Sequence, residues 1–145
     1  MALAIIQSSW DDAALMTASL EAIAAADIDI TADVYARFFA RCPRAQALFD
    51  NGARMAHGRM LNEVLLALLE TAEGKAYIEV LLQTQIGDHT ALGVMRSMYA
   101  EFFAALLDTL RQYAPLWNDA IDAAWQRQID AALSIVDRTI GNSME

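Results

Sequence analysis

Apolar residues recur along most of the chain at intervals of three and four positions, which is the spacing that gives a helix one apolar face. We find no sustained alternation of apolar and polar residues with a period of two, which a half-buried strand would require. Two prolines and six glycines are the main interruptions of the pattern. The sequence therefore predicts an all-α fold.

The first predicted helix ends at about Ala26. Ser8 and Ser9 each precede an aspartate by three positions, which is the spacing of a capping box, so the helix begins at or before these serines. Residues 27–30 form a short connector, and Thr31 is the expected cap of the second helix.

The later helix boundaries follow from proline, glycine and turn signals. No internal repeat or linker is visible, so residues 1–145 are expected to form a single domain. We expect helices from Thr31 to Pro43, from Pro43 to near Phe49, from the turn at 50–52 to 73–75, from about Ala76 toward His89, from beyond Gly93 to Pro115, and from there to a frayed tail that starts at Gly141.

Composition and charge exclude several classes of protein. Hydrophobic residues make up 57% of the chain and charged residues 20%, which is enough apolar surface for a folded core. The net charge of −9 opposes binding to the phosphates of nucleic acids. The longest apolar runs, such as residues 64–69, are far shorter than the roughly 20 residues that span a bilayer. The single cysteine, Cys42, and a first segment without the basic flank of a secretory signal favour a cytoplasmic location.

The chain has two histidines, and the predicted helices bring them level with each other. His57 lies 16 residues before Glu73, and His89 lies 14 residues after Lys75. At about 1.5 Å per residue, each histidine is then roughly 21 to 24 Å from the turn of a helical hairpin. Because Leu61 follows His57 by one turn, His57 borders the apolar face of its helix, and two imidazoles could face each other across an apolar slot.

Four interpretations of these histidines were weighed. Each one alone is most simply a satisfied core or boundary residue. A zinc site needs further His, Cys or carboxylate ligands, and neither histidine has one at a one-turn spacing. A di-iron bundle needs Glu-x-x-His pairs, which the sequence lacks. Two lone imidazoles suit a metal whose other ligands come with a macrocycle, and haem iron is such a metal.

Several short motifs, taken in order, resemble the globin family over nearly the whole chain. The spacing from Tyr35 to a proline eight positions later and a phenylalanine fourteen positions later is similar to that in bacterial globins and in the globin domains of flavohaemoglobins. The resemblance implies a bacterial-type single-domain globin, with three helices packed over three helices around haem b. The other matching segments are IIQSSW at residues 5–10, HGRML at 57–61, and HTALGV at 89–94, which Tyr99 follows.

The resemblance also implies roles for individual residues. His89 would be the proximal ligand of the haem iron, and His57 would be a distal residue that donates a hydrogen bond to the gas, binds the iron or swings out to solvent. Tyr35 would donate a hydrogen bond to a partly charged gas ligand. The other residues expected near the haem are Phe49 packed on its face, Leu61 against the ligand space, Leu82, Val94, Tyr99, Phe102 and Trp125 along the walls, and Arg59, with Arg54 and Arg96 as further candidates, at the propionates.

One departure from the flavohaemoglobin pattern bears on chemistry. Ile140 lies fifteen positions after Trp125, where that family has a glutamate tied to the proximal histidine, and the chain contains no flavin or nicotinamide domain. The push of electron density that supports peroxidase-like or dioxygenase chemistry is therefore in doubt.

Three functions follow from the resemblance. We expect reversible binding of dioxygen or another diatomic gas, such as nitric oxide or carbon monoxide, by a carrier, store or sensor. The first alternative is a nitric oxide dioxygenase or nitrite reductase that works with a separate reductase. The second is a haem-free regulatory module that binds a protein partner. The expected assembly is a monomer or a homodimer.

Overall fold

The computed structural model describes residues 2–49, 54–74 and 94–143. Within these three ranges the chain forms helices and short connections without any strand, so the all-α prediction is confirmed. The helices are α1 (Ala2–Ala25), α2 (Thr31–Arg41), α3 (Pro43–Phe49), α4 (Arg54–Ala72), α6 (Arg96–Tyr113) and α7 (Asp119–Ser143).

The first predicted helix start is confirmed, since α1 begins before Ser8 and Ser9, whereas the second is wrong in detail. Ser8 and Ser9 lie inside α1, because the alanines and leucine before them are strong helix formers and extend the helix toward the N-terminus. At the start of α2, the carboxylate of Asp29 accepts a hydrogen bond from the backbone N–H of Thr31 at 3.0 Å. Asp29 therefore supplies the acceptor that the Thr31 hydroxyl was expected to supply.

Of two predicted helix ends, one is confirmed and one is wrong. Gly74, just after α4, has a φ of +79°, the left-handed conformation that glycine adopts most easily, so the predicted stop is confirmed. The predicted tail from Gly141 is wrong, because α7 continues to Ser143. A glycine costs about 1 kcal/mol relative to alanine inside a helix, which is too little to end α7. The predicted helix toward His89 and the break at Gly93 lie outside the described residues.

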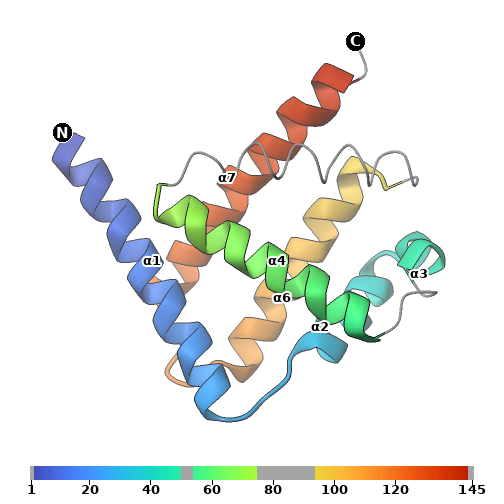
Figure 1. The fold of residues 1–145 in the computed structure, drawn as a ribbon, viewed down its shortest axis with the longest axis horizontal. Coiled ribbons are helices and arrows are strands. Elements are labelled where there is room, and N and C mark those ends of the chain that lie inside the picture. The colour runs from blue at the N-terminus through green and yellow to red at the C-terminus, as the bar shows by residue number, and fades with distance from the viewer. Residues whose placement is uncertain (1, 50–53, 75–93, 144–145) are drawn as a thin grey trace.

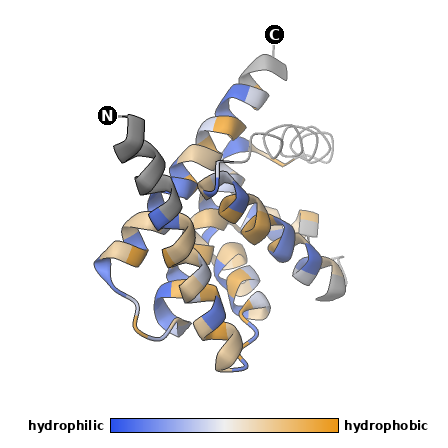
Figure 2. Cartoon of the chain, turned by 60° about the vertical axis from the view of Figure 1, so that its left-hand side comes forward, coloured by the Kyte–Doolittle hydropathy of each residue, from blue (hydrophilic) through white to orange (hydrophobic). Residues whose placement is uncertain are grey.

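The helices enclose one main core. α1 packs against α4 and α7, α6 packs against α7 and α2, and α4 crosses in front of α6 and α7 in the view of Figure 1. Hydrophobic and hydrophilic residues occupy different sides of the helices, as amphipathic helices require (Figure 2). The largest apolar side chains that are fully buried in this core are Met16, Leu68, Leu106, Leu110 and Trp125.

Polar groups inside this core have hydrogen-bond partners. The indole N–H of Trp125 donates to the hydroxyl of Ser19 at 3.0 Å, and that hydroxyl donates to the backbone carbonyl of Met16 at 2.7 Å. The hydroxyl of Thr109 donates to the carbonyl of Ala105 at 2.7 Å. Each of these buried hydroxyls therefore avoids the cost of an unpaired polar group.

A buried carboxylate is satisfied in the same manner. Asp12 of α1 is only 2% exposed and accepts hydrogen bonds from the guanidinium of Arg127 at 2.6 and 3.0 Å and from the amide of Gln128 at 3.0 Å. Both donors lie on α7. The contact therefore fixes α1 against α7 through a charge that is paired rather than isolated.

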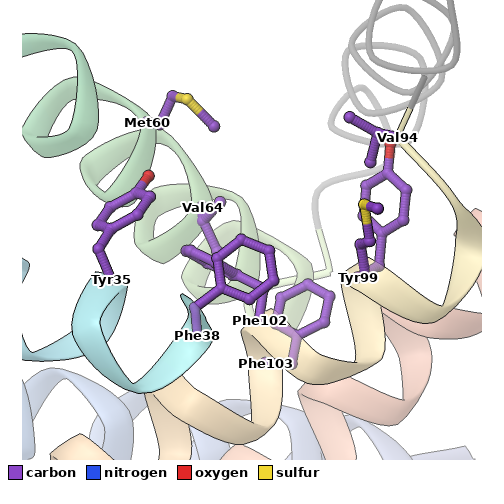
Figure 3. A pocket seen from close by; sticks show the side chains of 9 residues that line it. Tyr35, Phe38, Met60, Val64, Val94, Tyr99, Phe102 and Phe103 are labelled. Carbon is purple, nitrogen blue, oxygen red and sulfur yellow. The ribbon is translucent and has the colours of Figure 1, made fainter. Parts of the chain in front are cut away.

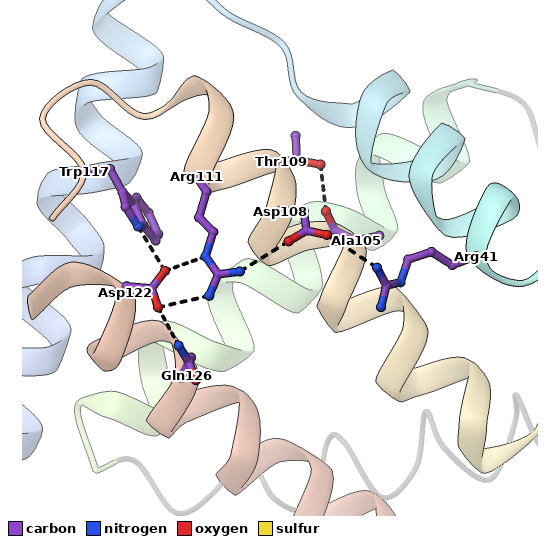
Figure 4. A network of polar contacts seen from close by, with 8 residues as sticks. All are labelled: Arg41, Ala105, Asp108, Thr109, Arg111, Trp117, Asp122 and Gln126. Atoms are coloured by element: carbon purple, nitrogen blue, oxygen red, sulfur yellow. Dashed lines mark hydrogen bonds and ion pairs between the residues drawn. The ribbon is translucent and has the colours of Figure 1, made fainter. Parts of the chain in front are cut away.

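A polar network joins α6 to α7 near the turn between them (Figure 4). The guanidinium of Arg111 donates to both carboxylate oxygens of Asp122, and the indole N–H of Trp117 donates to Asp122 at 3.0 Å. The amide of Gln126 donates to the same carboxylate. These hydrogen bonds, above all the one from Arg111, lower the pKa of Asp122 to about 2. Arg111 extends the network to Asp108 at 3.3 Å.

Hydrogen bonds near both ends of α2 tie it to α6. The hydroxyl of Tyr113 donates to the carboxylate of Asp33 near the start of α2. The guanidinium of Arg41 at the end of α2 donates to Glu101 at 2.8 Å. Both ends of α2 are therefore held against α6.

No helix in the described ranges combines the length and the apolar character that crossing a bilayer requires. Within the apolar run at residues 64–69, Leu68 lies in the core and Val64 lines a pocket, whereas Leu66 is exposed.

Candidate functional site

An apolar pocket lies between α2, α4 and the start of α6 (Figure 3). Helical spacing explains its construction, because residues three or four positions apart share one face of a helix. α2 and α4 each contribute two residues at such a spacing, and α6 contributes a cluster from its first two turns. The lining residues are Tyr35 and Phe38 of α2, Met60 and Val64 of α4, and Val94, Met98, Tyr99, Phe102 and Phe103 of α6 and the segment before it.

Tyr35 brings a polar atom into this pocket. Its side chain is 3% exposed, and its hydroxyl has no hydrogen-bond partner among the described residues. In Figure 3 the hydroxyl points away from the backbone of α2, on the side of the pocket where Met60 lies. Burial raises the pKa of Tyr35, so the hydroxyl stays protonated at neutral pH. Tyr35 therefore offers a neutral donor to a ligand in the pocket.

His57 lies beside Tyr35 rather than in the pocket lining. Its imidazole stacks on the Tyr35 ring with the two ring centroids 4.1 Å apart and the planes 12° from parallel. The ring of Phe39, one turn after Tyr35 on α2, meets the imidazole nearly edge to face, with centroids 6.2 Å apart. His57 does not line the pocket as the structure describes it. The half-buried imidazole is thus held against α2.

The predicted wall residues divide into two groups. Val94, Tyr99 and Phe102 line the pocket, and burial raises the pKa of Tyr99 to about 12. Leu61 instead faces the groove between α1 and α4 and the core there, and it is 2% exposed. Trp125 lies deep in the main core against α1, hydrogen-bonded to Ser19 and outside the pocket lining.

Sequence reasoning missed part of the lining. The missed residues were recognisable only by their spacing from residues already singled out: Phe38 three after Tyr35, Met60 and Val64 three and seven after His57, Met98 four before Phe102, and Phe103 beside it.

The arginines expected at the propionates are placed differently from one another. Arg96 is exposed, and its guanidinium donates to both carboxylate oxygens of Asp137 on α7. Arg59 is also exposed and lies in a separate shallow depression of α4 with Asn62 and Glu63. Arg59 is thus the expected arginine whose guanidinium the described structure does not commit to an ion pair.

Four predicted residues cannot be placed at the pocket. His89 and Leu82 lie outside the described residues, and the side chains of Phe49 at the end of α3 and Arg54 at the start of α4 lie outside the described part of the structure as well. Among the described residues, no group of three or more His, Cys, Asp or Glu side chains could hold a metal ion.

Comparison with known proteins gives one consistent result. The family model described as "Globin" matches residues 32–136. "Globin CTT-VIIB-4" of Chironomus thummi thummi is 31% identical over 141 residues, which cover 86% of this chain and 84% of that protein. "Globin CTT-VIIB-3" of the same organism is 30% identical over 142 residues, with 87% and 84% covered. These relatives are insect globins, so they give no support to the narrower bacterial-type or flavohaemoglobin-like subtype.

Proposed function

Because the chain belongs to the globin family, whose members bind haem and diatomic gases, we propose that it holds haem b in the pocket between α2, α4 and α6. The all-α globin fold supplies the frame, and the protein binds dioxygen or another diatomic gas at that cofactor. The haem iron supplies the reversible gas chemistry, and the chain supplies orientation, exclusion of water and a hydrogen bond.

The described residues fit this cofactor. The pocket is lined by hydrocarbon, aromatic and thioether groups, which suit the faces of a porphyrin. The observation that carries the proposal is the buried Tyr35 hydroxyl, which no described residue satisfies. A buried hydroxyl without a partner costs about 1–3 kcal/mol, so its persistence here favours a ligand as the partner. A gas with a partial negative charge is such an acceptor.

We assign the remaining roles by the globin resemblance. His89 is the proposed proximal ligand, and Phe49 and Leu82 are proposed to pack against the haem. Arg59 is the preferred partner for a propionate, because Arg96 already pairs with Asp137. His57 is proposed to lie beside the gas site, against the ring of Tyr35.

Gas binding is preferred to turnover. Ile140 stands where the flavohaemoglobin pattern has a glutamate, and nothing in the described residues favours nitric oxide oxidation, nitrite reduction or a partner reductase. The haem-free regulatory module is disfavoured by the family match and by the Tyr35 hydroxyl. The bacterial-type subtype is a proposal that rests on the spacing from Tyr35 to Pro43 and Phe49 and on the eight positions between Phe49 and His57. We also propose that residues 1–145 form a single domain, that the protein is a monomer or a homodimer, and that it is cytoplasmic.

An absorption titration with hemin tests the proposal. We expect a Soret band that saturates at one hemin per chain and shifts when the reduced protein meets dioxygen or carbon monoxide. His89→Ala should lose most of the bound haem, because iron would lose its proximal ligand. His57→Leu is the matched control and should retain haem. A parent protein that gives no Soret band with hemin would contradict the proposed function.

A further inference from the structure

Three aromatic rings from two helices meet beside the pocket. Tyr35 and Phe39, one turn apart on α2, have ring centroids 5.9 Å apart. The imidazole of His57 on α4 stacks flat on Tyr35 at 4.1 Å and meets Phe39 nearly edge to face at 6.2 Å. We call the rings of Tyr35 and Phe39 the aromatic clamp. Stacked and edge-to-face contacts at such centroid distances are the favourable arrangements for aromatic pairs.

The clamp separates the two polar groups that could act on a ligand. Tyr35 lines the pocket, whereas His57 is absent from the lining that the structure describes. The imidazole lies flat against the Tyr35 ring, so the stack leaves the Tyr35 hydroxyl with no partner in the described residues. To enter the pocket, the imidazole must leave both rings of the clamp.

We propose that Phe39 is a positioning residue which, together with the ring of Tyr35, holds His57 out of the pocket and so keeps the sixth coordination position of a haem iron open. The inference rests on the proposed function, since it concerns the approach of His57 to a bound haem. Tyr35 then has two roles: its hydroxyl donates a hydrogen bond to the gas, and its ring stacks against His57.

The expected effect of opening the clamp is modest and measurable. Loss of one aromatic contact should raise the ratio of His57-bound to open ferric iron by about 2- to 12-fold, which corresponds to about 0.5–1.5 kcal/mol. Carbon monoxide association with the reduced protein should slow by up to the same factor, because the gas must wait for His57 to leave, and the slowing is largest where the His57-bound form predominates.

The experiment compares the parent with Phe39→Leu, Tyr35→Phe and the double variant Phe39→Leu/His57→Leu. Phe39→Leu should increase the low-spin ferric band and slow carbon monoxide association. The double variant should be high-spin, which would assign the low-spin band to His57. Phe39→Tyr preserves the ring and should restore the parent spectrum. If Phe39→Leu does not fold, Phe39→Met removes the ring with less loss of volume and takes its place.

A second measurement does not depend on haem. In the haem-free full-length chain, the nuclear magnetic resonance signals of the His57 ring protons should be displaced by the neighbouring aromatic rings. Phe39→Leu and Tyr35→Leu should reduce that displacement, whereas Tyr35→Phe, which keeps the ring, should not.

The outcomes separate the two proposals. An unchanged spin state and an unchanged carbon monoxide rate in Phe39→Leu would overturn the positioning role even if the parent binds hemin normally. A parent that gives no Soret band would contradict the proposed function. His57 ring signals that do not respond to Phe39→Leu or Tyr35→Leu would overturn the clamp itself.

Discussion

The two ends of α6 are built on opposite principles. At the C-terminal end, Thr109 donates to a backbone carbonyl and Arg111 is joined to Asp122 by two hydrogen bonds. At the N-terminal end, Met98 and Phe102 face an apolar pocket, and the Tyr35 hydroxyl opposite them has no partner in the described residues. One end satisfies its polar groups within the fold. At the other end, the buried hydroxyl of Tyr35 on α2 has no such partner in the described residues, which costs stability in the haem-free chain.

The largest expected effect comes from Trp125, which lies in the core and outside the pocket lining. Trp125→Ala should lower the free energy of unfolding by about 3–5 kcal/mol, because it removes a fully buried ring and leaves a cavity. Urea denaturation measures the loss. Ser19→Ala, which keeps the ring but removes the acceptor of the indole and the donor to the Met16 carbonyl, should cost less, about 1–3 kcal/mol. A shifted Soret maximum with unchanged stability would place Trp125 at the haem instead.

Tyr35→Phe tests the opposite end. Loss of a hydrogen bond to a partly charged ligand costs about 1.5–3 kcal/mol, so dioxygen should dissociate about 10- to 150-fold faster, and carbon monoxide should respond much less. The haem-free variant should be as stable as the parent, or more stable by about 1 kcal/mol, because a buried unsatisfied hydroxyl is removed. Stopped-flow kinetics and urea denaturation measure the two effects. Equal changes for both gases would indicate a steric role.

Asp122→Asn should show the reverse profile, with a loss of stability and unchanged gas kinetics. The carboxylate accepts hydrogen bonds from Arg111, Trp117 and Gln126, and we expect a loss of about 1–2 kcal/mol because Arg111 is partly screened by solvent.

The pH dependence of that loss gives a sharper test. The pKa of Asp122 is lowered from 3.8 to about 2 in the folded chain, so its contribution to stability is complete above pH 3.8 and disappears as the pH falls through about 2. The difference in unfolding free energy between parent and Asp122→Asn should shrink over the same interval. A constant difference down to pH 2 would contradict the lowered pKa.

A pair of glycines gives the smallest effects. Gly58 lies within α4 beside His57, and a Cβ there would meet nothing within 4 Å, so Gly58→Ala should stabilise the chain by about 0.5–1 kcal/mol. Gly74 has a positive φ, so Gly74→Ala should destabilise the chain by about 1 kcal/mol. The midpoint temperature of thermal unfolding should rise for Gly58→Ala and fall for Gly74→Ala. A slower gas association in Gly58→Ala alone would connect the stiffness of α4 to the pocket.

The sequence predicted the helices well because each one carries a recognisable apolar stripe, and it placed Tyr35, Val94, Tyr99 and Phe102 where the pocket lies. The phase of α4 was not predictable from the sequence. The apolar arc of this helix is wide enough to face both the α1 core and the pocket, and periodicity cannot decide which neighbouring position faces which. Leu61, which the resemblance puts against the ligand space, faces the groove beside α1, whereas Met60 and Val64 line the pocket.

The position of His57 could not be predicted for a different reason. The helical hairpin estimate fixes its level along α4, but the direction of the imidazole depends on which side chains of α2 it meets across the helix interface. Trp125 shows the same limit. Its spacing fits an inward face of α7, but only the packed structure shows that this face meets Ser19 of α1.

The hydrogen bonds that join α2 to α6 bear on how a gas molecule enters and leaves the pocket. Asp33 is bonded to Tyr113 near one end of α2 and Arg41 to Glu101 at the other, with Tyr35 between them. We therefore expect α2 and α6, which form one wall of the pocket, to move as one body. The opposite wall, α4, meets α2 through side-chain packing, including the stacked ring of His57. Among the described walls, we therefore expect α4 to undergo the displacements that admit a small molecule.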